Sequence, residues 1–248
     1  MRDPPISTSH ITSTLRPRFR RVPAMASGLG PLRRTGRFLL SPRRSRLRPP
    51  SPRPLPPAES YCVRGKSSDC APLSGLGVRV KRIAGVGVKV YACGLYVDVA
   101  SALRALGSAF SGRDPRDVAR DEALYAAVLC DPGVEKTVRL AFARDLDSSK
   151  IADALSERLR PVLGAGSESL RAFEAPFAGV TFRKGETLTF SAVAGELRTS
   201  IRGKEVGCVK DPELCVALFD AYLGKDPVVP GAKKSLGEKL AELATETR

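Results

Sequence analysis

Apolar and polar residues alternate between positions 78 and 99, on both sides of a turn that contains glycine. Alternation of period two is typical of a strand with one buried face, so this segment is predicted to form a β-hairpin. One face of the hairpin carries a row of valines, and we expect this row to point into the core: Val78, Val80, Val88 and Val90.

Four more segments show strand character, at residues 137–143, 187–192, 197–201 and 206–209. Turns at Gly195 and Gly203 separate the last three, which are short enough to pair as antiparallel neighbours.

Apolar residues at helical spacing predict helices over residues 103–110, 118–128, 151–162, 167–173 and 233–244. The sharpest boundaries belong to a further helix from Pro212 to Leu223. Asp211 supplies an N-cap oxygen, Pro212 suits the first helical position, and Gly224 follows the end. Strands and helices in this order predict a single α+β domain with a largely antiparallel sheet covered on one face by helices.

Charge divides the chain into two parts. Residues 1–58 hold thirteen arginines, twelve of the twenty prolines and one acidic residue, Asp3, whereas the rest of the chain has 28 basic and 25 acidic residues. An arginine-rich, acid-poor leader ahead of a balanced sequence has the composition of an organelle transit peptide, and a disordered RNA-binding arm is the alternative. We therefore expect a disordered transit peptide and linker over residues 1–70, a folded domain over residues 71–248, and no nucleic-acid partner for that domain.

The longest apolar stretch of the leader is only Phe38-Leu39-Leu40, which is too short for a secretory signal. Nothing later in the chain approaches the roughly 20 apolar residues of a membrane span. The mature protein is expected to be soluble, without a transmembrane segment.

Histidine and cysteine usage excludes several kinds of chemistry. The one histidine is His10, in the leader, so the folded part offers no Ser-His-Asp triad, no histidine metal site and no histidine proton shuttle. The six cysteines form no CxxC pair, and we expect them to be reduced thiols. No metal and no cofactor are predicted.

Two glycine pairs, Gly75-x-Gly77 and Gly85-x-Gly87, lack the third glycine of a dinucleotide loop, and neither opens a helix after a strand. We interpret them as glycines that permit a tight hairpin turn. With the turn centred on Gly85, Arg79 lies directly opposite Tyr91.

The Arg79 and Tyr91 pair has two interpretations. It could belong to a solvated face, as Lys81 and Lys89 on the same face suggest. If helices instead enclose the far end of this face, a guanidinium and a phenol in an apolar pocket would bind a carboxylate, since arginine supplies two parallel donors and tyrosine a third.

The segment from Gly77 to Asp98 reads Gly-Val-Arg-Val-Lys-Arg-Ile-Ala-Gly-Val-Gly-Val-Lys-Val-Tyr-Ala-Cys-Gly-Leu-Tyr-Val-Asp. It closely resembles the hairpin of the chalcone isomerase superfamily. Residues 136–161, 185–209 and 217–224 resemble later blocks of the same family, so the resemblance covers roughly residues 75 to 240. It implies the open-faced β-sandwich of that family.

The resemblance also bears on the site. In chalcone isomerases the arginine that Arg79 matches steers the phenolate of the substrate, and a threonine, a tyrosine, an asparagine and a Thr or Ser complete a polar network. Those four positions correspond here to Tyr91, Lys150, Glu157 and Ala221. The Arg79 and Tyr91 combination instead resembles the plastid fatty-acid-binding branch of the family, in which these residues hold the fatty-acid carboxylate.

The resemblance is compatible with three functions: a non-catalytic fatty-acid-binding protein of plastid fatty-acid metabolism, a chalcone–flavanone isomerase (an intramolecular lyase), and a non-catalytic helper of flavonoid enzymes. A helper would show an exposed apolar patch. The first makes a fatty acid the partner and the chloroplast stroma the location, with the mitochondrion as the alternative. Expected ligand-binding residues are Arg79 and Tyr91, and the expected cleft wall, whose members could equally be ordinary core, is Leu95, Leu140, Phe142, Leu155, Leu159, Leu218, Ala221 and Tyr222.

Overall fold

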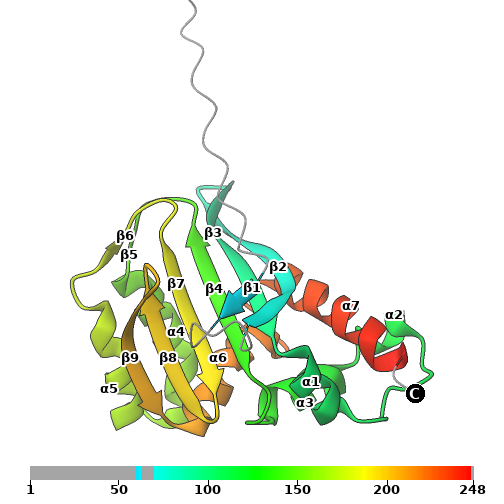
Figure 1. Cartoon of the computed structure of the whole chain (residues 1–248). Helices are drawn as coiled ribbons and strands as arrows, with labels where there is room; N and C mark the ends of the chain where they lie inside the picture. The colour runs from blue at the N-terminus through cyan, green and yellow to red at the C-terminus, as the bar shows by residue number, and fades with distance from the viewer. Residues whose placement is uncertain (1–59, 63–69, 247–248) are drawn as a thin grey trace, which may run out of the picture. The chain divides into compact units, whose positions relative to one another are not determined.

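A seven-stranded antiparallel sheet forms the centre of the protein (Figure 1), in a computed structural model that describes residues 60–62 and 70–246. The strand order is β1-β2-β3-β4-β7-β8-β9. The strands are β1 (Ser60–Cys62), β2 (Cys70–Ile83), β3 (Val86–Val97), β4 (Lys136–Phe142), β7 (Thr187–Val193), β8 (Glu196–Ile201) and β9 (Lys204–Lys210), and a separate short pair is formed by β5 (Leu146–Asp147) and β6 (Thr181–Phe182).

Seven α-helices accompany the sheet in the part of the chain that the structure describes. They are α1 (Val99–Leu106), α2 (Pro115–Val118), α3 (Glu122–Cys130), α4 (Ser149–Leu163), α5 (Glu168–Glu174), α6 (Pro212–Leu223) and α7 (Pro230–Glu246). The bounds of α6 are those predicted, because Asp211 accepts hydrogen bonds from the backbone nitrogens of Glu213 and Leu214 at 2.9 and 3.1 Å. The two predicted helices between residues 103 and 128 are displaced: α1 begins earlier, after its N-cap Asp98, and α3 ends later.

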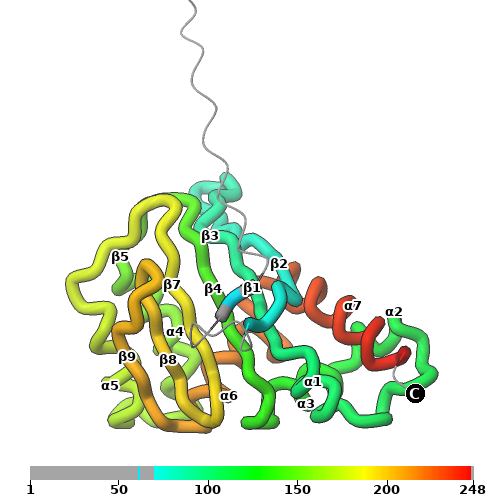
Figure 2. Tube along the Cα trace, in the orientation of Figure 1, coloured from blue at the N-terminus to red at the C-terminus, as the bar shows by residue number. Residues whose placement is uncertain are grey.

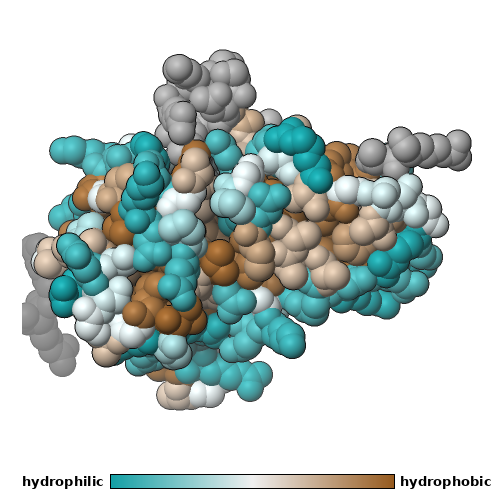
Figure 3. Space-filling model, turned by 90° about the horizontal axis from the view of Figure 1, so that it is seen from below, coloured by the Kyte–Doolittle hydropathy of each residue, from teal (hydrophilic) through white to brown (hydrophobic). Residues whose placement is uncertain are grey.

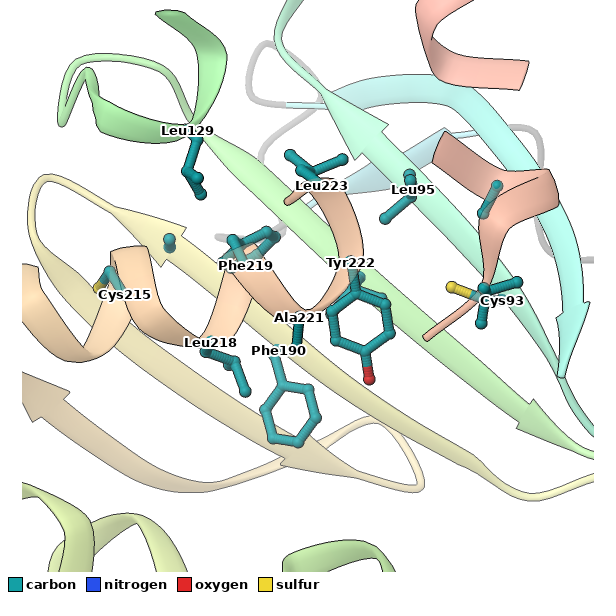
Figure 4. Packing of buried hydrophobic residues seen from close by; sticks show 14 of the residues in the cluster. Cys93, Leu95, Leu129, Phe190, Cys215, Leu218, Phe219, Ala221, Tyr222 and Leu223 are labelled. Carbon is teal, nitrogen blue, oxygen red and sulfur yellow. The ribbon is translucent and has the colours of Figure 1, made fainter. Parts of the chain in front are cut away.

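The helices cover one face of the sheet, as predicted (Figure 1). Alternate residues of β4 and β7 that point to this face are buried, among them Leu140, Phe142 and Phe190. Figure 4 shows Leu218 and Phe219 of α6 packed in the same layer as Phe190. The other face carries threonine, serine and arginine at the alternating positions, so the α+β class and the open-faced sheet are confirmed.

Strand β2 and helix α7 are far apart in the sequence but lie side by side (Figure 2). Two glycines allow the close approach: a Cβ atom on Gly75 would lie 2.5 Å from the Ala232 carbonyl oxygen, and one on Gly77 would lie 2.5 Å from the Ala232 nitrogen. The interpretation of Gly75-x-Gly77 as turn residues is therefore wrong. These glycines make room for a helix.

The prediction that the hairpin valines face the core is also wrong for two of them. Val78 and Val80 are each 47% exposed on the outer face, and Val88 and Val90 are half-buried. The physical reason is that α7 and the cleft described below lie against the opposite face, which carries Arg79.

The hairpin turn consists of Ala84 and Gly85, both with positive φ (48° and 80°). This two-residue turn would pair residues whose numbers sum to 169, as Val80 and Lys89 do. A bulge between Arg79 and Val80 then shifts the register by one residue and places Arg79 opposite Tyr91. The predicted pair is confirmed, although the predicted turn centre was off by half a residue.

The folded part begins before the predicted boundary, because β1 pairs with the start of β2 from Ser60↔Pro72 to Cys62↔Cys70. The predicted transit segment up to residue 59 lies outside the described residues. Cys70 is disulfide-bonded, which corrects the expectation of six reduced thiols; the free cysteines are Cys93, Cys130, Cys208 and Cys215.

Seen from below, hydrophilic residues lie mostly around the rim, and more hydrophobic residues gather in the middle of the view and towards its right half (Figure 3). Among the described helices, none combines the length and apolar character needed to cross a bilayer.

Candidate functional site

A cleft of about 710 Å³ lies beside the Arg79 and Tyr91 pair. Strands β2 and β3 form one wall and helix α4 forms the other, with the segment around β5 between them. Its lining residues are Arg79, Lys81, Ile83, Val90, Tyr91, Arg144, Asp145, Leu146, Asp147, Lys150, Ile151, Ala154, Leu155, Glu157, Arg158, Thr181, Tyr222 and Val228.

Arg79 is positioned from the backbone of a distant loop. Its Nη1 donates a 2.8 Å hydrogen bond to the Val228 carbonyl oxygen, in the connection between α6 and α7. No acidic side chain forms a salt bridge with Arg79 among the residues that the structure describes. The guanidinium is therefore a half-buried cation whose remaining donors have no acidic partner among the described residues.

Tyr91 is only 7% exposed and packs edge-on against Phe142, with ring centroids 6.2 Å apart. Burial raises the pKa of the Tyr91 phenol well above its ordinary value, and the Arg79 guanidinium and the Tyr222 phenol oppose that shift only in part. Burial likewise raises the pKa of Tyr222, which interacts with Tyr91 and is seen on α6 in Figure 4. Both phenols stay neutral, so Tyr91 can donate a hydrogen bond to an anion in the cleft.

Helix α4 braces the same loop from its other side. Arg158 donates to the Asp226 carbonyl oxygen at 2.8 Å and to its carboxylate at 2.9 Å, and the Val228 nitrogen donates to the Ala221 carbonyl oxygen at 2.8 Å. Together with the Arg79 bond, these contacts hold the loop between α6 and α7 in place, and Val228 of this loop lines the cleft.

The structure brings four predicted site residues to this cleft: Arg79, Tyr91, Leu155 and Tyr222. Ala221 instead lines a smaller pocket of about 410 Å³ between α4 and α6. The other five predicted wall residues are buried core residues that do not line the cleft, with exposures of 2% or less: Leu95, Leu140, Phe142, Leu159 and Leu218. Leu95, Leu140 and Phe142 share the sheet face of Tyr91, whereas Leu159 of α4 and Leu218 of α6 belong to the helices packed in the same core.

Several cleft residues were not predicted as such. Lys150, Ala154, Glu157 and Arg158 recur at helical spacing along α4, beside its buried row. This charged stripe was visible in the sequence, although it is also what an ordinary solvated helix face looks like. Only the structure shows that this row of α4 lines the same cleft as the hairpin.

Within the described residues, no group of His, Cys, Asp and Glu side chains is arranged to hold a metal ion. The cleft lining combines five basic and three acidic side chains with two phenols, Tyr91 and Tyr222, and with apolar side chains such as Ile151 and Leu155. That combination suits an amphiphilic anion, because burying a carboxylate is costly unless it is paired and hydrogen-bonded.

Comparisons with known proteins agree on one family. The family model described as "Chalcone isomerase like" matches residues 71–237. Chalcone–flavanone isomerase of Hordeum vulgare is 26% identical over 69% of this chain and 80% of its own length, and fatty-acid-binding protein 1 of Arabidopsis thaliana is 25% identical over 76% of this chain and 70% of its own. The crystal structure of an Arabidopsis thaliana fatty-acid-binding protein superposes with a TM-score of 0.62 at 23% identity, covering 75% of this chain and 99% of that one.

Proposed function

Because this chain belongs to the chalcone isomerase-like family, we propose that it is a fatty-acid-binding member that holds the ligand carboxylate with Arg79 and Tyr91. One observation carries the proposal. Arg79, which forms no salt bridge among the described residues, lies across from the neutral, buried phenol of Tyr91 in the same cleft. Fatty-acid-binding relatives from Arabidopsis support it.

The size and lining of the cleft agree with such a ligand. A volume of about 710 Å³ lies in the ordinary range for small-molecule sites, about 300–1,000 Å³. Each methylene that the acyl chain buries contributes about 0.8 kcal/mol, and the carboxylate loses less on leaving water when charged and neutral donors replace its hydration.

We favour fatty-acid binding over chalcone isomerisation because three other positions of the isomerase polar network carry different residues here. Lys150 and Glu157 line the cleft where the family resemblance would place a tyrosine and an asparagine, and Ala221 stands in place of a hydroxyl residue. Without those groups, the site lacks the network that would position a chalcone or its water.

Tyr91→Phe tests the phenol. Losing one neutral hydrogen bond is expected to weaken the binding of a long-chain fatty acid about 5- to 10-fold, or about 1–1.5 kcal/mol. The measurement is displacement of a fluorescent fatty-acid analogue, with Tyr61→Phe as the matched control because Tyr61 packs on Tyr96, away from the cleft.

The pH dependence of wild-type binding checks the same group. A phenol of ordinary pKa, about 10, would lose its donor and repel the carboxylate as the pH approaches 10. Because burial raises the pKa of Tyr91, affinity is expected to stay constant between pH 7 and pH 10. A tenfold loss centred on the ordinary tyrosine pKa would argue against a buried Tyr91 donor.

We also propose a plastid location, on the composition of residues 1–58 and the family branch. A fluorescent protein fused behind the full chain should accumulate in chloroplasts and lose that location when residues 1–58 are deleted. Accumulation in mitochondria would overturn the plastid assignment.

A further inference from the structure

The β2–β3 hairpin exposes an unusual amount of apolar side chain. Seven large hydrophobic residues are exposed in the described part of the chain, and five of them lie on this hairpin; their exposures run from 45% to 65%: Leu76, Val78, Val80, Ile83 and Val86. The remaining two, Val162 and Val206, lie on α4 and β9, so most of the exposed apolar surface lies on the hairpin, with Leu76, Val78 and Val80 on its outer face and Ile83 and Val86 on the cleft side of its tip. Concentrated exposed apolar surface of this kind marks an interaction site.

Charge on the hairpin has a single sign. Between Cys70 and Val97 there are four basic residues, Arg79, Lys81, Arg82 and Lys89, and no acidic residue. Among the described residues, the salt bridges involve none of these four. The hairpin therefore carries uncompensated positive charge among its exposed valines.

The same hairpin forms one wall of the cleft. Arg79, Lys81, Ile83 and Val90 line it, and the rest of its lining adds three cations, Arg144, Lys150 and Arg158, and three carboxylates, Asp145, Asp147 and Glu157. Whatever binds the hairpin is therefore next to the cleft.

We propose that the β2–β3 hairpin docks on an anionic lipid bilayer. Apolar side chains mixed with lysine and arginine suit the boundary between acyl chains and anionic headgroups. A second copy of the chain is a poor occupant, because two hairpins of the same charge repel each other. Docking goes beyond the proposed function. Its role, to bring a membrane fatty acid close to the cleft, rests on the proposed function.

The chain contains no tryptophan, so a single introduced one reports on its own surroundings. Val86→Trp places the probe on the exposed hairpin, and Val206→Trp places a matched probe on the exposed face of β9. Both full-length variants are mixed with vesicles of phosphatidylcholine, with and without phosphatidylglycerol. The local readout matters because the arginine-rich residues 1–58 are themselves expected to attract anionic vesicles.

The Val86→Trp emission should shift to the blue with the anionic vesicles only, and the Val206→Trp emission should not shift. Adding Arg82→Glu and Lys89→Glu to the Val86→Trp chain should weaken vesicle binding through the hairpin about tenfold or more. No shift for Val86→Trp, or an equal shift for both probes, overturns the proposal and leaves the hairpin to a soluble protein partner.

The same variants separate this proposal from the proposed function. Arg82 and Lys89 do not line the cleft, so their substitution should leave fatty-acid affinity in solution unchanged. Docking without fatty-acid binding would refute the function and leave the hairpin assignment intact, and fatty-acid binding without docking would do the reverse.

Discussion

Replacing Arg79 with methionine is expected to weaken fatty-acid binding about 30- to 100-fold, or about 2–3 kcal/mol, because it removes a charge-assisted hydrogen bond to the carboxylate. Methionine keeps much of the apolar stem. Arg79 also bonds the Val228 carbonyl oxygen at 2.8 Å, so a modest loss of thermal stability should accompany the change. The measurement is a displacement titration together with a melting curve.

The control is Arg82→Met, on the same strand and in the same hairpin. Arg82 is exposed and does not line the cleft. Its substitution removes the same net charge and should leave the affinity within twofold of wild type. Equal losses in the two variants would mean that general charge, and not a specific contact at Arg79, attracts the ligand.

Gly75→Val should destabilise the protein by about 1–3 kcal/mol, the usual cost of overpacking a close contact. A Cβ atom at this position would lie 2.5 Å from the Ala232 carbonyl oxygen and 2.9 Å from the Leu236 Cβ, so α7 must move away from β2. For a domain of this size the melting temperature should fall by about 3–10 °C. Because Val228 lies just before α7, the Arg79 contact and ligand affinity should weaken as well.

Gly166→Ala is the matched control for this change. No atom lies within 4 Å of the Cβ it would add, and its backbone does not have a positive φ. Its melting temperature should match that of the wild type. If Gly75→Val also has the melting temperature of the wild type, the close packing of β2 on α7 does not stabilise the hairpin.

Local patterns in the sequence predict most elements of the fold. They are most accurate where capping residues mark the two ends of a helix. Helix α6 is the clearest case, since Asp211, Pro212 and Gly224 each have a position-specific reason to stand at its ends. Periodicity alone places α1 and α3 several residues from their true bounds, because it does not use the N-caps Asp98 and Asp121, whose carboxylates accept from the backbone nitrogens of Ser101 and Ala123.

The faces of the hairpin show what alternation cannot decide. A period of two divides residues into two sets, but the helix that covers one set, α7, lies more than 140 residues further along the chain. Val78 and Val80 were therefore assigned to the core, although they lie on the outer face. The predicted pairing of Arg79 with Tyr91 is correct only because a bulge that the sequence pattern does not reveal offsets the half-residue error in the turn centre.

The wall of the cleft was predicted less well than its polar pair. Leu95 and Leu140 lie on the same sheet face as Tyr91, and Leu218 lies on α6, but all three are buried in the core and leave no space. The open volume lies further along the hairpin, where α4 presents a row that includes Lys150 and Glu157. Whether two packed layers touch or separate depends on side-chain volumes along both of them, which no single segment specifies.

The most direct test of the fatty-acid assignment is the lipid content of the purified full-length protein, extracted and analysed by mass spectrometry beside Arg79→Met. We expect long-chain fatty acids near one per protein in the wild type and a large loss in the variant. If neither protein carries a fatty acid and the wild type instead cyclises a chalcone, the account of this cleft is wrong.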